Sequence, residues 1–168
     1  MMNTSKVLGR KALFVAVSVV ALGAGNAAFA TTDSFSVTAT VIENCTVSAA
    51  DLAFGNYDPI VANLSAAIPQ SADLTVTCTD GSAVSIALDD GDNFSSGRRM
   101  RLGVTTDFLS YELYQEAGLE NVFGSGAQAV AHNGTGAAET VTVHGNLPGG
   151  QNVPVGSYSD IIDVTITL

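Results

Sequence analysis

The stretch FSVTATVIENC, residues 35–45, alternates apolar and polar side chains. The apolar residues that share one face of this extended segment are Phe35, Val37, Ala39 and Val41. A period of two is typical of a strand that is buried on one side only. No strand-like segment precedes it with which it could form a hairpin. The sequence therefore raises the question of which sheet this first strand completes.

A secretory signal peptide is predicted ahead of this strand. A basic start with three Lys and Arg residues precedes an apolar run over residues 12–22, and residues 28–30 read Ala-Phe-Ala. Small residues at such positions suit a signal peptidase, so we expect cleavage between Ala30 and Thr31. The apolar run is short for a membrane span, and a retained N-terminal anchor is the alternative.

The chain that remains after cleavage, residues 31–168, has the size of one domain. It retains three arginines and no lysine against all sixteen acidic residues, hence a formal charge of −13. Such a charge disfavours nucleic acid and anionic lipid as partners and helps to keep an exported protein soluble. We expect no nucleic-acid binding, and no membrane insertion of the mature chain because no second long apolar run follows.

The exported part contains only two cysteines, Cys45 and Cys78. In an oxidising compartment an even pair usually forms one disulfide. Closing a loop of this length should stabilise the fold by about 3–4 kcal/mol. A redox pair is disfavoured because the spacing is not C-x-x-C, and two cysteines alone cannot form a structural zinc site.

Short alternating runs predict an all-β fold, since no segment has a convincing helical period. The predicted strands fall within residues 72–79, 83–88, 98–104, 108–118, 140–145 and 157–168. Residues 79–82, Thr-Asp-Gly-Ser, predict a hairpin turn between the first two, because Asp-Gly suits the positive φ angles of such turns. Residues 124–138 predict a long loop with at most one weak strand. Many short strands at this spacing indicate a β-sandwich or a barrel.

The last predicted strand has an apolar face that continues to the final residue. The members of this face are Tyr158, Asp160, Ile162, Val164, Ile166 and Leu168. No further strand follows Leu168 in this sequence, so we expect one edge of the strand to lack a partner from its own chain. Exported proteins normally cover such an edge, because a free apolar edge promotes aggregation. The chain thus combines a spare strand at one end with an uncovered edge at the other.

Five segments resemble, in this order, the spore coat protein U domain family, which includes the pilin subunits of archaic chaperone–usher pili. They are residues 35–59, 74–81, 98–104, 111–118 and 156–168. The most specific pieces are C-x-V…L-x-FG-x-Y-x-P from Cys45 to Pro59, Y-x-LY at 111–114, and the ending G-x-Y-x-D…V-x-I-x-L. Two positions depart from the family's usual pattern. The aromatic position after the 111–118 segment is here Phe123, and the final aromatic residue is replaced by Leu168.

The resemblance implies an incomplete immunoglobulin-like β-sandwich that is completed by a donor strand from a neighbouring subunit. A periplasmic pilus chaperone would lend a strand during export, and the next subunit would replace it at the outer-membrane usher. The implied organisation is a signal peptide at 1–30, a donor strand segment at 31–40 and a spore coat protein U (pilin) domain at 41–168.

The resemblance also assigns roles to particular residues. The plugs that would enter acceptor pockets are Phe35, Val37 and Ala39, and Ala39 is small, so we expect the first two to dominate affinity. The C-terminal strand would border the acceptor groove through Ile162, Val164, Ile166 and Leu168. The two cysteines match the family's pair that links the first two strands of the sandwich.

The function implied by the resemblance is that of a structural subunit of a surface pilus, polymerised head to tail from identical subunits. The chain would pass through the periplasm to the cell surface and support adhesion and biofilm formation. We expect no catalysis and no cofactor. The alternative is a secreted coat or matrix protein with the same domain that does not form usher-assembled pili.

A small secreted enzyme is the weaker hypothesis. The only two histidines are His132, in a run of small residues typical of a loop, and His144, on the predicted solvent face of a strand. No G-x-S-x-G motif accompanies either histidine. The sequence therefore offers no convincing nucleophile and base.

Two charged clusters also suggest sites. The acidic loop at 89–93 resembles a calcium loop, but the twelfth position from Asp90 is Arg101 rather than the required Glu. A solvated turn is favoured. Arg98, Arg99 and Arg101 could contact an acidic neighbouring subunit, or could pair with those aspartates within the domain. The Gly-rich segments at 124–126 and 134–136 lack the strand-to-helix context of a phosphate site.

Overall fold

The computed structural model describes residues 29–168, so most of the predicted signal peptide, residues 1–28, lies outside the described residues. Residues 40–168 form one compact unit, and residues 29–39 belong to a separate one. Residues 29–44 carry no regular secondary structure. Among residues 29–168, no helix has the length and apolar character that a membrane crossing requires.

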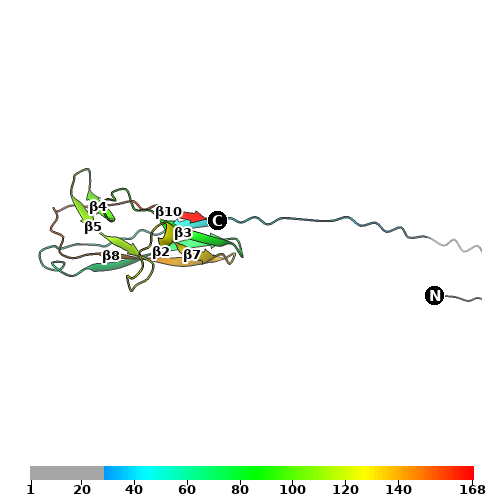
Figure 1. Ribbon diagram of the computed structural model, residues 1–168, viewed down its shortest axis with the longest axis horizontal. Helices are drawn as coiled ribbons and strands as arrows, with labels where there is room; N and C mark the ends of the chain where they lie inside the picture. The colour runs from blue at the N-terminus through cyan, green and yellow to red at the C-terminus, as the bar shows by residue number, and fades with distance from the viewer. Residues whose placement is uncertain (1–28) are drawn as a thin grey trace, which may run out of the picture. The chain divides into compact units, whose positions relative to one another are not determined.

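The compact unit is built from antiparallel strands in three sheets (Figure 1). The first sheet has the order β1 (Cys45–Ala49), β2 (Ile68–Cys78), β8 (Ala138–Leu147), β6 (Glu112–Tyr114). The second has the order β10 (Val164–Thr167), β3 (Ala83–Leu88), β7 (Val130–Asn133). The third has the order β5 (Phe108–Ser110), β4 (Arg99–Leu102), β9 (Tyr158–Ser159). One short 3₁₀ helix, η1 (Gly126–Gln128), precedes β7.

The core lies between these sheets. Its most deeply buried apolar side chains, each at most 2% exposed, are Val76, Cys78, Ile86, Leu88, Phe123 and Leu147. They come from β2 and β8 on one side and from β3 on the other, with Phe123 from the loop after β6. Full burial of one such aliphatic or aromatic side chain is worth about 1.5–3 kcal/mol. The predicted all-β sandwich is thus confirmed.

The two cysteines form the expected disulfide, with their Sγ atoms 2.06 Å apart. Cys45 lies directly opposite Cys78 in the register of β1 and β2. The bond therefore ties the first strand of the compact unit to the end of the second, as the resemblance implied.

The prediction of a hairpin at residues 79–82 is wrong, although the turn itself is present. The amide of Ser82 donates to the carbonyl of Thr79 at 3.1 Å, and Gly81 has a φ of 82°. However, β2 pairs with β1 and β8, whereas β3 pairs with β10 and β7. The turn carries the chain from one sheet to the opposite one, because both strands have one strongly apolar face and bury these faces against each other.

The two longest predicted strands are each divided between two sheets. Leu109, Tyr111 and Leu113 keep the predicted alternation and are all buried, but β5 ends before Tyr111 and β6 begins after it. The amide of Tyr111 donates instead to the carbonyl of Arg98 at 3.1 Å. The C-terminal run likewise gives β9 and β10, and its middle residues bond to the loop at 89–97.

Candidate functional site

An apolar groove of about 1060 Å³ opens along one side of the sandwich. One wall is formed by residues 49–57, which continue from β1, and the other by residues 153–162, which lead to β10. Strands β1 and β10 each occupy the edge of a sheet and lie next to each other beyond the groove. The groove therefore runs between the first and the second sheet, where no strand joins their edges.

The floor of the groove consists of core side chains from all three sheets. Its aliphatic members include Leu74, Leu88, Leu109, Val143 and Leu147. Phe54 and Tyr111 extend the floor with a tilted pair of rings whose centroids are 6.0 Å apart. An extended segment seated here would place its apolar side chains against the core.

The two walls leave backbone polar groups without backbone partners. Among residues 29–168, neither 51–57 nor 151–157 forms a hydrogen bond between its own backbone and another backbone group. Backbone amides and carbonyls are strong hydrogen-bonding groups that rarely stay unpaired once water is excluded. Both walls could therefore pair with an inserted strand.

The first wall packs closely against β8 because of a glycine. A Cβ atom added at Gly145 would lie 2.9 Å from atoms of both Leu52 and Phe54. With no side chain at this position, the two residues can lie directly over the strand. Tyr57 is fixed further along, where its hydroxyl donates to the carbonyl of Pro148 at 3.1 Å and accepts from the amide of Gln151 at 2.9 Å.

Of the four residues predicted to border the groove, two line it and two do not. Ile162 and Val164 line the groove. Ile166 packs on the core beyond the end of the groove, and Leu168 is 58% exposed. Sequence reasoning missed the opposite wall at 49–57, although the motif L-x-FG-x-Y-x-P, residues 52–59, overlaps it and marks its inward residues Leu52, Phe54 and Tyr57.

Two hydrogen bonds hold the Asp160 carboxylate in the groove lining. The hydroxyl of Tyr111 donates to Oδ2 of Asp160 at 2.8 Å, and Nδ2 of Asn93 donates to Oδ1 of the same carboxylate at 2.8 Å. Burial, and next the hydrogen bond to Asp160, raise the pKa of Tyr111 far above its ordinary value. The phenol therefore stays protonated and orients Asp160 at any physiological pH.

The predicted plug residues lie in the separate segment. Phe35 is 88% exposed, Val37 is 83% exposed, and Ala39 is exposed as well. Exposed apolar side chains that recur at every second residue are typical of a segment with a binding role rather than of a solvated linker.

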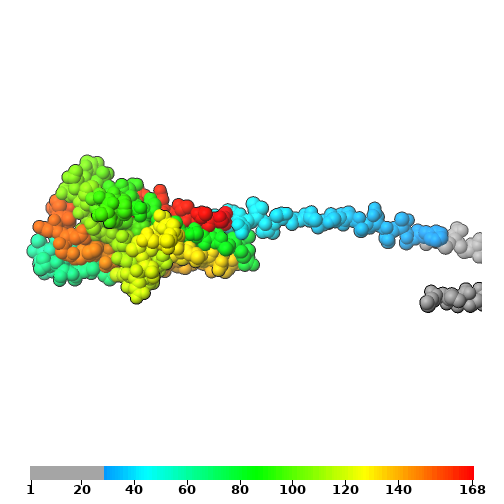
Figure 2. All heavy atoms as spheres, in the orientation of Figure 1, coloured from blue at the N-terminus to red at the C-terminus, as the bar shows by residue number. Residues whose placement is uncertain are grey.

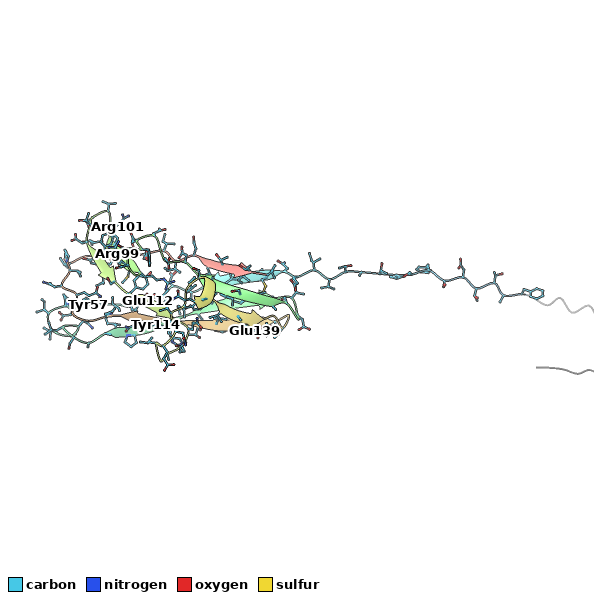
Figure 3. The ribbon with its side chains drawn as sticks, viewed as in Figure 1. Tyr57, Arg99, Arg101, Glu112, Tyr114 and Glu139 are labelled. Atoms are coloured by element: carbon cyan, nitrogen blue, oxygen red, sulfur yellow. A yellow bond between two sulfur atoms is a disulfide. The ribbon has the colours of Figure 1, made fainter. Side chains whose placement is uncertain are left out.

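The histidines do not form a recognisable catalytic arrangement with a nucleophile. His132 lies in β7 rather than in a loop, so this expectation is wrong, and its Nε2 is 3.2 Å from Oε2 of Glu139 (labelled in Figure 3). His144 lies in β8, where it alternates with the inward-facing Val143 and Gly145. In the part of the chain that the structure describes, no group of three or more His, Cys, Asp or Glu side chains could hold a metal ion.

The three arginines donate hydrogen bonds to groups of their own domain. Arg98 is only 2% exposed and donates to Oε1 of Glu112 at 2.6 Å and to the carbonyl of Asp89. The expected pairing with aspartate side chains of the 89–93 loop is wrong for Arg98, whose carboxylate partner is Glu112. The carboxylate of Asp89 accepts hydrogen bonds from the amides of Gly91 and Asp163 instead.

The two other arginines of this cluster lie on β4 (Figure 3). Arg99 stacks over the ring of Phe108, with the guanidinium carbon 4.0 Å from the ring centroid, and donates to the carbonyl of Asn93. Arg101 is exposed and donates to the carbonyl of Gly103. These hydrogen bonds connect β4 to the loops that precede and follow it.

Comparison with known proteins gives matches over nearly the whole described chain. The family model for the Spore Coat Protein U domain matches residues 31–165. Protein U of Myxococcus xanthus is 36% identical over 173 residues, covering 93% of this chain and 94% of that protein.

A solved structure supports the same fold. It is the complex of the chaperone CsuC with the tip adhesion subunit CsuE from archaic chaperone–usher Csu pili of Acinetobacter baumannii, with a TM-score of 0.59 and 19% identity. The match covers 77% of this chain and 41% of the other, so this chain spans less than half of that protein's length.

The fold class expected from the sequence is confirmed by this likeness. The matched family is named for a spore coat protein, and the matched structure contains a pilus subunit. Coats and pili are structural assemblies. With a family model matched over residues 31–165 and a relative 36% identical along its length, this chain belongs to the Spore Coat Protein U domain family.

Proposed function

We propose that this protein is an exported structural subunit of a surface pilus, assembled by donor-strand complementation along the chaperone–usher pathway. Residues 31–40 of one subunit would fill the groove of a neighbouring subunit, with Phe35, Val37 and Ala39 as plugs. Ile162 and Val164 would face the donor along the groove, and Ile166 and Leu168 would continue this edge beyond it. Adhesion and biofilm formation are the biological outcome that we propose for the polymer.

The observation that carries this proposal is the groove whose walls leave the backbone groups of residues 51–57 and 153–157 without backbone partners. A strand inserted there gains main-chain hydrogen bonds worth about 0.5–1.5 kcal/mol each. It also buries apolar side chains at about 1.5–3 kcal/mol each when they are fully enclosed. β-Augmentation of this kind explains why the apolar floor and the backbone groups are open at the same place.

The dimensions of the donor segment support the same proposal. Side chains at every second residue of a strand lie about 6.6 Å apart and point to the same face. Residues 31–39 would span about 30 Å when extended, and the wall at 49–57 contains the same number of residues. A donor of this length can therefore follow the wall from end to end.

The remaining parts of the proposal follow from export. We propose a signal peptide at 1–30 that is cleaved between Ala30 and Thr31, a donor segment at 31–40 and a pilin domain at 41–168. A periplasmic chaperone would cover the apolar groove before polymerisation, and an outer-membrane usher would exchange that chaperone for the next subunit. The solved complex of CsuE with the chaperone CsuC supports a chaperone as the first partner.

The test is the substitution Phe35→Asp in the full chain, expressed with its assembly machinery. A carboxylate in an apolar pocket is strongly disfavoured, so the variant should stop polymerising while it still folds and remains bound to the chaperone. The matched control is Phe35→Leu, which keeps an apolar plug and should still polymerise. Polymers of Phe35→Asp that equal those of the parent would contradict the donor assignment.

The second candidate function is a secreted coat or matrix protein that assembles without an usher. It is favoured by the likeness to Protein U and by the family to which that protein gives its name. Deleting residues 31–40 separates the two hypotheses. A pilus subunit should lose assembly altogether, whereas a coat protein that does not use this strand should assemble as before.

A further inference from the structure

A second apolar surface lies outside the groove, on the loop at 58–66. Ile60, Val61 and Leu64 are 68%, 76% and 63% exposed. We call these three side chains the pole patch. The loop that carries them is held by hydrogen bonds, so flexibility of the chain does not account for their exposure.

Hydrogen bonds fix the loop that carries the pole patch. Oδ1 of Asp58 accepts from the amides of Ile60 and Val61 at 3.0 and 3.1 Å. The amide of Asn63 donates to the carbonyl of Asp58 at 2.7 Å, and its side chain donates to the carbonyl of Ala66 at 3.0 Å. The loop thus holds its apolar side chains outward.

The pole patch adjoins one end of the groove. Tyr57 and Pro59 line the groove, and the patch begins at the next residue. The amide of Gly150 donates to the carbonyl of Asn63 at 2.8 Å, which joins this loop to the segment that enters the second wall. Figure 2 shows the two segments, in teal and orange, gathered at the same end of the domain.

The opposite end of the domain carries exposed apolar side chains as well. Val41 is 83% exposed and Ile42 is 75% exposed. Oγ1 of Thr79 accepts from the amide of Asn44 at 3.1 Å, and the amide of Thr79 donates to the carbonyl of Asn44 at 2.9 Å. Residue 79 follows the end of β2, whereas the pole patch precedes its start, so the two apolar surfaces lie at opposite ends of this strand.

The apolar side chains of both surfaces lie in uncharged segments of a strongly acidic chain, flanked by Glu43 and by Asp58. Residues 34–42 and residues 59–72 contain no Asp, Glu, Lys or Arg, although the chain has sixteen acids and six basic residues. Two copies of such a protein repel each other over most of their surfaces. A contact between copies is therefore favoured where both sides are apolar and uncharged.

We propose that the pole patch is the docking surface for Val41 and Ile42 of the next copy of this chain, which makes a second contact between adjacent subunits. This inference rests on the proposed donor insertion and fixes its direction. Ile42 follows the last plug, Ala39, by three residues, or about 10 Å of extended chain. A donor that leaves the groove at its Tyr57 end brings these residues to the patch.

The opposite direction would make no use of the patch. A donor that left the groove at its Val164 end would carry Val41 and Ile42 to the other end of the acceptor, and the pole patch would stay exposed. The proposal therefore places Ala39 at the Tyr57 end and the start of the donor toward Val164. It also limits how freely adjacent subunits can rotate about the linker at 40–44.

Cysteine cross-linking of assembled full-length protein tests this inference. The pair Ile42→Cys with Val61→Cys should give a ladder of disulfide-linked subunits on a non-reducing gel after mild oxidation. Each single-cysteine variant should give no ladder. The second pair, Ile42→Cys with Thr167→Cys, reports the opposite direction of insertion, because Thr167 is exposed near the C-terminal end of β10.

Each outcome decides the inference separately from the proposed function. Polymers that give a ladder with Val61→Cys but not with Thr167→Cys support the docking surface. Polymers that give a ladder only with Thr167→Cys, or with neither pair, overturn it and leave donor insertion intact. A parent protein that never polymerises in the presence of its assembly machinery overturns the proposed function, and this inference with it.

Discussion

At the scale of single residues, Arg98 stands out because, among residues 29–168, no other charged side chain is buried. Its guanidinium is 2% exposed and joins Glu112 on β6 to the carbonyl of Asp89 in the loop after β3. Removing one partner of a buried ion pair leaves the other charge uncompensated. Glu112 is 28% exposed, so water can relieve part of that cost.

We expect Arg98→Met to lower the free energy of unfolding by about 3 kcal/mol. The substitution leaves the Glu112 carboxylate without its cationic partner and the Asp89 carbonyl without this donor. Chemical denaturation measures the change. The control is Arg101→Met in the neighbouring strand β4, where an exposed side chain should alter stability by less than about 0.5 kcal/mol. Equal effects of the two substitutions would show that Arg98 has no special role.

Asp58 gives a pH-dependent prediction. Hydrogen bonds from the amides of Ile60 and then Val61 lower the pKa of its carboxyl below the ordinary 3.8. Because the folded pKa lies below the unfolded one, the stabilising contribution is present above about pH 4 and is lost as the pH falls through the folded value.

An NMR titration of the Asp58 carboxyl carbon should therefore give a midpoint below 3.8. The amides of Ile60 and Val61 should lose protection from exchange over the same acidic range. In Asp58→Ala this protection should be absent at neutral pH as well. A midpoint at or above 3.8 would contradict the assigned hydrogen bonds.

At the scale of elements, the disulfide holds β1 against β2 at the point where the chain enters the domain. It joins residues 33 apart in the sequence, and cross-linking a loop of that length should stabilise the fold by about 3–4 kcal/mol. The double substitution Cys45→Ser with Cys78→Ser should lower the free energy of unfolding by that amount. The reduced parent protein should behave in the same way. An unchanged midpoint in denaturant would contradict the prediction.

The alternation of side chains predicted which residues are buried better than it predicted which strands pair. Leu74, Val76 and Cys78 face the core as expected. Val84, Ile86 and Leu88 of β3 do the same. The Asp-Gly turn between them fits a hairpin and a crossing between sheets equally well. Only the burial of both apolar faces against each other, which is a tertiary effect, decides between these connections.

The groove was partly predictable for a similar reason. The apolar face of the C-terminal run indicated an edge near Val164, and Val164 lines the groove. Residues 50–57 of the opposite wall have no regular secondary structure, so periodicity gives little sign of this wall. Its signal is the motif from Leu52 to Pro59. The split of the C-terminal run could not be predicted, because it depends on hydrogen bonds between residues 161–163 and the loop at 89–97.

At the scale of the whole molecule, the proposed polymer should be unusually hard to dissociate. Each subunit junction would combine a ladder of main-chain hydrogen bonds with several buried plugs, and all of these must break together before a donor can leave. We expect rod-like polymers that resist SDS at room temperature, detected by electron microscopy and by gels of unheated samples. Polymers that fall apart in SDS without heating would indicate a shallower contact than the groove allows.

The most direct test of the central claim is to find where residue 35 lies in the assembled protein. Phe35 would be replaced by the photo-reactive p-benzoylphenylalanine in a mixture of isotopically labelled and unlabelled subunits, and cross-links would be mapped by mass spectrometry. We predict cross-links to groove residues such as Leu74, Leu88 or Val164 that join labelled to unlabelled subunits. Cross-links confined to single chains, or located away from the groove, would contradict donor-strand complementation between subunits.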